Sequence, residues 1–109
     1  MQHKARKRFG QNFLHDQVVI NRIVTAVAAK QDQQVIEIGP GKGAITEGLV
    51  ASGATVTAVE IDTDLIAYLR VAFATKDNFS IIDSDALKVD FSQLQDGDTP
   101  LKIVGNLPY

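Results

Sequence analysis

The sequence contains no cysteine and only two histidines, His3 and His15, among its 109 residues. The missing cysteines exclude a disulfide framework and a thiolate metal site, and two separated histidines are too few for a zinc cluster. No apolar run approaches the roughly 20 residues of a membrane span, and no apolar segment follows the first basic residues as in a secretory signal. We therefore expect a soluble protein of the cytoplasm, without a metal and without a membrane partner.

Acidic and basic residues are distributed unevenly along the chain. The net charge is −2, yet four basic residues and no acid lie within the first eight positions, whereas the rest of the chain has 13 acids against 7 bases. The four basic residues are Lys4, Arg6, Lys7 and Arg8. A basic arm on an acidic body favours a local contact with phosphate groups, as in RNA binding, although a solvated terminus explains the same charges.

Short β-branched runs alternate with segments of helical periodicity, which is typical of a single α/β domain. The expected strands are residues 35–38, 55–60, 79–82 and 101–105. The expected helices run from the capping residue Asp16 to about Lys30, over 44–52, and from Thr63 or Asp64 to Phe73. Right-handed crossovers then predict a parallel sheet in the order 3-2-1-4, with helices on both faces.

Two surfaces of this predicted fold are set by apolar residues. The first helix is expected to bury the apolar positions Val19, Ile20, Ile23, Val24 and Val27. The last strand, residues 101–105, becomes an apolar sheet edge, and an uncovered edge predicts an edge-strand dimer.

Three glycines at alternate positions follow the first strand. We expect Gly39 to permit a sharp exit from the strand, Gly41 to let the backbone approach a ligand, and Gly43 to let the next helix pack tightly on the strand. The pattern Gly39-x-Gly41-x-x-Ala44 also satisfies the dinucleotide fingerprint, whereas a P-loop is excluded because Lys42 is not followed by Ser or Thr. The turn therefore predicts a nucleotide-type cofactor without choosing among such cofactors.

Three acids lie within or at the ends of the predicted strands. Glu60 can accept both hydroxyls of a ribose, or cap the next helix. Glu37 is costly inside an apolar strand unless it is paired, and it favours a cofactor with an ammonium and a sulfonium over NAD; it could bind that charge or orient the glycine turn. Asp85 can accept from the exocyclic amine of adenine beside the small Ala86, or serve as a turn residue.

The tetrapeptide Asn106-Leu107-Pro108-Tyr109 follows the last strand. The side-chain carbonyl of Asn106 and the backbone carbonyl of Leu107 can accept from the two N–H groups of an adenine N6 amine, which favours a more nucleophilic nitrogen. Pro108 fixes the backbone, and Tyr109 offers a face on which an extruded base can stack. These four residues are the predicted catalytic set, although a bare tetrapeptide of this kind could also be a turn.

Together these motifs resemble those of the small-subunit ribosomal RNA adenine N6,N6-dimethyltransferases, in order and in spacing. The segments that carry the resemblance are Arg8-Phe9-Gly10-Gln11-Asn12-Phe13-Leu14, Glu37 to Gly43, Glu60-Ile61-Asp62, Asp85-Ala86 and Asn106 to Tyr109. The resemblance implies the Rossmann-like fold of class I methyltransferases. It also implies S-adenosylmethionine as cofactor and the transfer of two methyl groups to N6 of each of two adjacent adenosines in small-subunit (16S-type) rRNA during ribosome biogenesis.

The resemblance also implies roles for individual residues. Asn12 and Leu14 would cover the cofactor, Asn106 would hold the target nitrogen, and the basic arm would contact RNA. The implied cofactor-binding set is Asn12, Leu14, Glu37, Gly39, Gly41, Glu60, Ile61, Asp85, Ala86 and Asn106. We expect residues 1–15 to form the basic arm and covering loop, and residues 16–109 to form the N-terminal part of a catalytic domain, with weak or no activity alone.

Three alternatives stay open. A large-subunit rRNA adenine methyltransferase of the macrolide-resistance type shares the mechanism, although Gly10, Pro40 and Leu107 favour the small-subunit branch. An NAD-binding Rossmann domain explains the glycine turn and Glu60 but gives no role to Glu37 or the final tetrapeptide. A non-catalytic RNA-binding or ribosome-assembly module would keep the fold without turnover.

Overall fold

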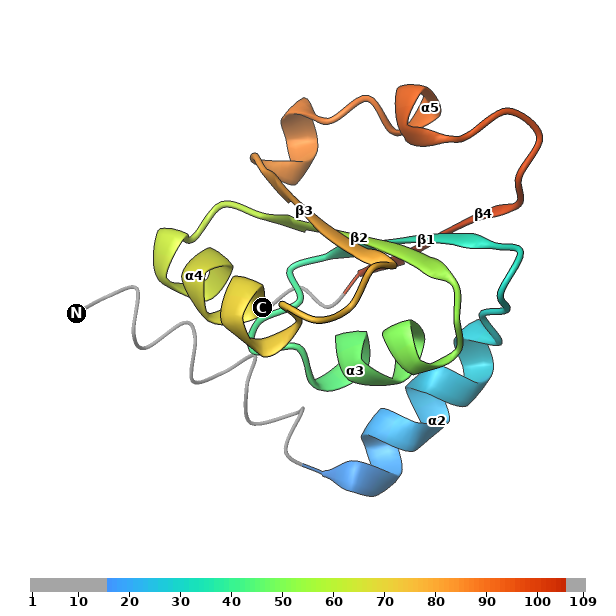
Figure 1. Cartoon of the computed structure of the whole chain (residues 1–109), viewed down its shortest axis with the longest axis horizontal. Helices are drawn as coiled ribbons and strands as arrows, with labels where there is room; N and C mark the ends of the chain where they lie inside the picture. Colours follow the sequence, from blue (N-terminus) through green and yellow to red (C-terminus); the bar gives the residue numbers. More distant parts are fainter. Residues whose placement is uncertain (1–15, 106–109) are drawn as a thin grey trace.

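The computed structural model describes residues 16–105 of the chain (Figure 1). Within this range, β1 (Gln34–Ile38), β2 (Thr55–Glu60), β3 (Phe79–Asp83) and β4 (Leu101–Gly105) form one parallel sheet in the order β3-β2-β1-β4. The order, the directions and the central position of β1 confirm the prediction from sequence. The predicted strand bounds are correct to within one residue at each end.

Helices cover both faces of this sheet (Figure 1). On one side lie α2 (Gln17–Val27), α3 (Ala44–Ala51) and α4 (Thr63–Ala72), and on the other lie the short 3₁₀ helix η1 (Ala86–Lys88) and α5 (Phe91–Leu94). The arrangement is the predicted Rossmann-like α/β fold. Among residues 16–105, none of the helices has the length and apolar character to cross a bilayer.

The main core lies between the sheet and the helices α3 and α4. Val35 and Val56 project from the strands against Leu49, Leu69 and Phe73 of the helical layer, and all five side chains are buried. Burial of each such side chain stabilises the fold by about 1.5–3 kcal/mol. Because Ile45, in the first turn of α3, belongs to the same core, the core holds in place the helix that follows the turn after β1.

The end of α2 differs from the prediction. The helix ends at Val27 rather than near Lys30, and Ala28 adopts the left-handed conformation with φ 50°. The reason is a contact with a distant strand: Nζ of Lys102 in β4 donates to the carbonyl oxygens of Val27 (2.6 Å) and Ala28 (3.1 Å). A charged donor satisfies carbonyls that helix continuation would otherwise use.

The start of α2 and its buried face are partly as predicted. Asp16 caps the helix, and its carboxylate accepts from the N–H of Val18 at 2.9 Å. Ile20 is buried, but Val19, which was expected on the apolar face, is 38% exposed. A β-carbon added at Gly48 of α3 would lie 2.7 Å from the Val24 side chain, so the two helices approach closely at this glycine.

The helix α4 begins at Thr63, one of the two predicted starts. Its capping residue is Asp62, whose Oδ1 accepts from the N–H groups of Asp64 (2.8 Å) and Leu65 (3.2 Å). The cap fixes the direction of the chain immediately after β2, which is where Glu60 lies.

Candidate cofactor-binding site

The turn after β1 is left-handed at each of its three glycines. The φ angles are 67° at Gly39, 61° at Gly41 and 88° at Gly43, a region in which residues with a β-carbon are strained. A β-carbon added at Gly41 would meet no atom within 4 Å. Gly41 therefore leaves the backbone open on one side, as the predicted approach of a ligand requires.

Gly43 has a different packing role from the one predicted. It was expected to let the helix pack on the strand, but a β-carbon there would lie 2.9 Å from Cε2 of Phe73 and 3.2 Å from Cδ2 of Leu69. The close contact is thus with the end of α4 rather than with β1. Gly43 is also the N-cap of α3 and supplies no side-chain hydrogen bond to that helix.

Glu37 is buried at the base of this turn, with 1% of its surface exposed. Its Oε1 accepts a hydrogen bond from the hydroxyl of Thr46, which is completely buried in the first turn of α3. Burial raises the pKa of the Glu37 carboxyl to about 7, and the bond from Thr46 lowers the pKa in part. The acid that looked costly in the sequence has a polar partner, as a buried carboxyl requires.

Glu60 closes β2 and is largely buried, with 9% of its surface exposed. Its Oε2 accepts from the N–H groups of Ile61 (3.0 Å) and Asp62 (3.1 Å). These bonds direct the carboxylate toward the end of the strand. The neighbouring Ile61 is 63% exposed, which leaves an apolar side chain at the same edge of the sheet.

Asp85 follows β3 and caps η1. Its Oδ1 accepts from the N–H of Leu87 at 3.0 Å. Asp85 is therefore a turn residue, which was the alternative to its predicted role in binding adenine. Asp85 and Ala86 are each partly exposed. A carboxylate with one oxygen in a local bond still offers acceptor capacity to a ligand.

These groups lie together at the end of the sheet where the carboxyl termini of the parallel strands meet. The N–H of Gly39 donates to the carbonyl of Val59 (3.1 Å), and the N–H of Ser84 donates to the carbonyl of Glu60 (3.1 Å). In the β1–β4 register, Ile38 pairs with Gly105, so β4 ends beside the glycine turn. A ligand across this edge would meet the turn, Glu60 and the segment after β3 in sequence.

Several predicted site residues lie outside the described residues. They are Lys4, Arg6, Lys7, Arg8, Asn12, Leu14, Asn106, Leu107, Pro108 and Tyr109. Within residues 16–105, no group of three or more histidine, aspartate or glutamate side chains is arranged to hold a metal ion.

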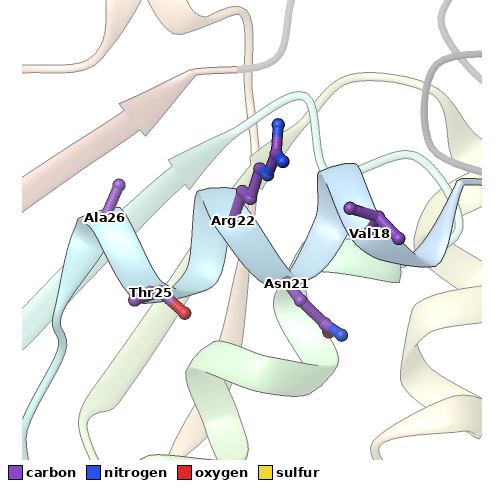
Figure 2. Close-up of a pocket in the computed structure, with 5 residues that line it drawn as sticks. All are labelled: Val18, Asn21, Arg22, Thr25 and Ala26. Carbon is purple, nitrogen blue, oxygen red and sulfur yellow. The ribbon is translucent and has the colours of Figure 1, made fainter.

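A groove of about 430 Å³ on the outer face of α2 is separate from this edge. Figure 2 shows its described lining residues, all of them exposed and all on the one helix: Val18, Asn21, Arg22, Thr25 and Ala26. None of the described residues that line it is a predicted cofactor residue, and the chemistry of the strand ends therefore identifies the candidate site better than the size of this hollow does.

Thr46 is the site residue that the sequence reasoning missed. A signal for it exists: an acid inside an apolar strand needs a buried hydrogen-bond donor, and a threonine in the first turn of the next helix is a natural candidate. The pairing itself depends on how α3 packs against β1, which the sequence pattern alone does not give.

The parallel order 3-2-1-4, the glycine turn after the central strand and the acid at the end of the neighbouring strand define the Rossmann-like fold of the class I methyltransferases. Residues 2–109 match the family described as ribosomal RNA adenine dimethylase, and the chain belongs to that family.

Curated relatives are similar over nearly the whole chain. The ribosomal RNA small subunit methyltransferase A of Hahella chejuensis is 57% identical over 98% of this chain, and that of Pseudomonas aeruginosa is 54% identical over 99%. The match covers 39% and 40% of those two proteins, so the chain spans about two fifths of their length.

Two solved structures share the fold. The 23S rRNA methyltransferase ErmE is 31% identical, with a TM-score of 0.73 over 86% of this chain and 36% of its own. A dimethyladenosine transferase from Plasmodium falciparum is 26% identical, with a TM-score of 0.69 over 86% of this chain and 33% of its own.

Proposed function

We propose that this chain is the cofactor-binding part of an enzyme that transfers methyl groups from S-adenosylmethionine to N6 of two adjacent adenosines in small-subunit rRNA. The observation that carries the proposal is the match of residues 2–109 to the adenine dimethylase family. Relatives at 54–57% identity are named for the small subunit, which favours that substrate over the large-subunit alternative. We also propose that it acts in the cytoplasm.

The geometry of the strand ends supports S-adenosylmethionine as the cofactor, which supplies an electrophilic methyl group. Gly39 and Gly41 would underlie its methionine portion, since the open side of Gly41 leaves room for a ligand against the backbone. Glu60 would accept the ribose hydroxyls, and the exposed Ile61 would pack against the adenosine. The donor set fits an adenosine whose polar groups face acceptors and whose ring meets an apolar side chain.

The adenine ring would lie toward the end of β3. Asp85 would accept from its exocyclic amine, and the small Ala86 would leave room for the ring. One carboxylate oxygen of Asp85 already accepts a hydrogen bond from the N–H of Leu87, so the side chain is held in place before a ligand binds. Asn12 and Leu14 would cover the cofactor from the preceding segment.

The methyl-accepting group would be held by the segment after β4. Asn106 and Leu107 would accept from the two N–H groups of the target adenine, Pro108 would fix the backbone, and Tyr109 would stack on the base. The pairing of Gly105 with Ile38 supports this assignment, because the end of β4 then lies beside the glycine turn. Catalysis would rest on positioning and exclusion of water.

The N-terminal arm and the domain division complete the proposal. Lys4, Arg6, Lys7 and Arg8 would contact RNA phosphates within an arm and covering loop of residues 1–15. Residues 16–109 would form the first part of the catalytic domain. Because the chain spans about two fifths of its relatives, we expect methylation to need the remaining length that they possess.

Calorimetric titration of the complete protein tests the choice of cofactor. We expect S-adenosylhomocysteine to bind and NAD not to bind, because the buried Glu37 favours a cationic ligand and gives no advantage to an anionic pyrophosphate. Tight NAD binding without a response to S-adenosylhomocysteine would contradict the proposal and would restore the dehydrogenase alternative.

A further inference from the structure

We infer that Thr46 is a positioning residue for cofactor binding, whose hydroxyl holds the Glu37 carboxylate at the base of the glycine turn so that its negative charge attracts the ammonium group of the cofactor. The inference rests on the proposed function, because it concerns how that same site would recognise the amino-acid portion of S-adenosylmethionine. It adds a residue that would act through Glu37 rather than by touching the ligand.

The position of the bond carries the argument. Glu37 belongs to β1 and Thr46 to the first turn of α3, so their hydrogen bond closes the turn that contains Gly39, Gly41 and Gly43. Both side chains are buried, with 1% and 0% of their surfaces exposed. A single buried bond therefore joins the two elements that enter and leave the turn.

Charged side chains on the described elements around Glu37 contact other groups or are exposed. Lys102 of β4 donates to the end of α2, and Glu60 of β2 accepts from the N–H groups that follow it. Lys42 of the turn lies over the ring of Tyr68 at 5.9 Å, and Glu47 of α3 is exposed. Arg22 of α2 is exposed on the outer face of that helix.

The hydroxyl has a chemical consequence for Glu37. Burial favours the neutral carboxyl, and the donor from Thr46 opposes that tendency by stabilising the carboxylate. Without the hydroxyl, more of the protein would carry a neutral Glu37 near neutral pH. A neutral acid gives up its attraction for an ammonium group, while contacts to the adenosine portion are untouched.

The test compares Thr46→Val, which keeps the side-chain shape without the hydroxyl, with Thr46→Ser, which keeps the hydroxyl. Each complete protein is titrated calorimetrically with S-adenosylhomocysteine and with methylthioadenosine, which lacks the amino acid, between about pH 6 and about pH 8. We expect Thr46→Val to weaken S-adenosylhomocysteine binding about tenfold at pH near 7 and to leave methylthioadenosine within about twofold. Thr46→Ser should restore most of the affinity.

The pH profile separates this role from a purely structural one. In the unaltered protein, S-adenosylhomocysteine affinity should fall as the pH decreases through about 7, because Glu37 gains a proton. In Thr46→Val the fall should begin at higher pH, and methylthioadenosine should show no such shift. An unchanged affinity and profile in Thr46→Val, or an equal loss for both ligands, would overturn the inference alone. Absence of binding of both ligands to the unaltered protein would overturn the proposed function as well.

Discussion

Carboxylates at the strand ends are fixed by local backbone bonds before any ligand binds. Glu60 accepts two N–H groups through Oε2, and Asp85 accepts one through Oδ1. Such bonds between a side chain and its own following backbone set the side-chain direction. A group that is already ordered loses less conformational freedom when a ligand arrives, so its contribution to affinity is larger.

Replacement of Glu37 by Gln is expected to stabilise the unliganded protein at alkaline pH. The pKa of the carboxyl is 4.5 in its ordinary state and about 7 in the fold, so the folded state holds a proton that the unfolded state has released between these values. Stability is therefore lost as the pH rises from about 4.5 through about 7, by about 3 kcal/mol in total. Gln stays neutral and still offers an oxygen to Thr46.

Urea denaturation of both proteins at about pH 5 and about pH 8 measures this difference. The stability of the glutamine variant relative to the unaltered protein should increase with pH, and other titrating groups cancel in the comparison. A stability difference that is the same at both pH values would contradict a raised pKa at Glu37.

Single residues were predicted unevenly from the sequence. The carboxylates of Glu37, Glu60 and Asp85 stand out because acids at strand ends or within apolar runs need a physical reason. Thr46 does not stand out, because a threonine in a helix has many ordinary explanations. The pairing of Thr46 with Glu37 depends on how α3 packs against β1, and the sequence pattern does not give that packing.

Among the elements, the glycine turn combines two requirements that look the same in the sequence. Gly41 faces open space, whereas Gly43 is closed in by Phe73 and Leu69. Both have positive φ angles, so both disfavour a β-carbon. Only the surrounding atoms distinguish the glycine that leaves room for a ligand from the glycine that lets α4 pack.

Alanine at these two glycines should therefore have different effects. We expect Gly43→Ala to destabilise the fold by roughly 2–4 kcal/mol, from backbone strain plus the clash with Phe73. Gly41→Ala should cost roughly 1–2 kcal/mol in stability, since only the backbone is strained. It should weaken S-adenosylhomocysteine binding more than tenfold if the cofactor lies on the open side.

Thermal denaturation and calorimetric titration of the two variants provide the comparison. Equal losses of stability would show that the contact with Phe73 carries no energetic weight. Undiminished ligand binding in Gly41→Ala would mean that the open side of the turn is not where the cofactor lies.

Element bounds were predictable wherever local chemistry decides them. The strands follow β-branched runs, and Asp16 signals the start of α2. The end of α2 was not predictable because Lys102, from the last strand of the described chain, supplies the donor for its carbonyls. A contact between residues so far apart in sequence leaves no local pattern.

At the scale of the whole molecule, the outer side of β4 is a surface through which we expect self-association. The strand lies at the edge of the described sheet, and Ile103 is 51% exposed. An apolar edge with unpaired backbone groups is a template for pairing with another chain.

The overall topology was predictable in full because right-handed crossovers leave few arrangements for four parallel strands.

The 109-residue chain is expected to associate through β4 at high protein concentration, and Ile103→Lys should shift it toward the monomer. Val71→Lys is a matched control, because Val71 is 80% exposed on α4, away from that edge. Sedimentation velocity over a range of concentrations measures the effect. A chain that stays monomeric throughout, or equal effects of the two substitutions, would contradict association through β4.

The pairing of β1 with both β2 and β4 also bears on the order in which the chain folds. Gln34 aligns with Thr55 on one side and with Leu101 on the other. Pairing of β1 with β2 closes a short loop that contains only α3. Pairing of β1 with β4 closes a much longer loop, which contains every described element from α3 to α5. Loop-closure entropy and contact order both rise with that separation. On a ribosome, β1, β2 and β3 emerge as a contiguous unit. The strand β4, which pairs with the other side of β1 at the edge of the described sheet, is the last of the four described strands to be synthesised.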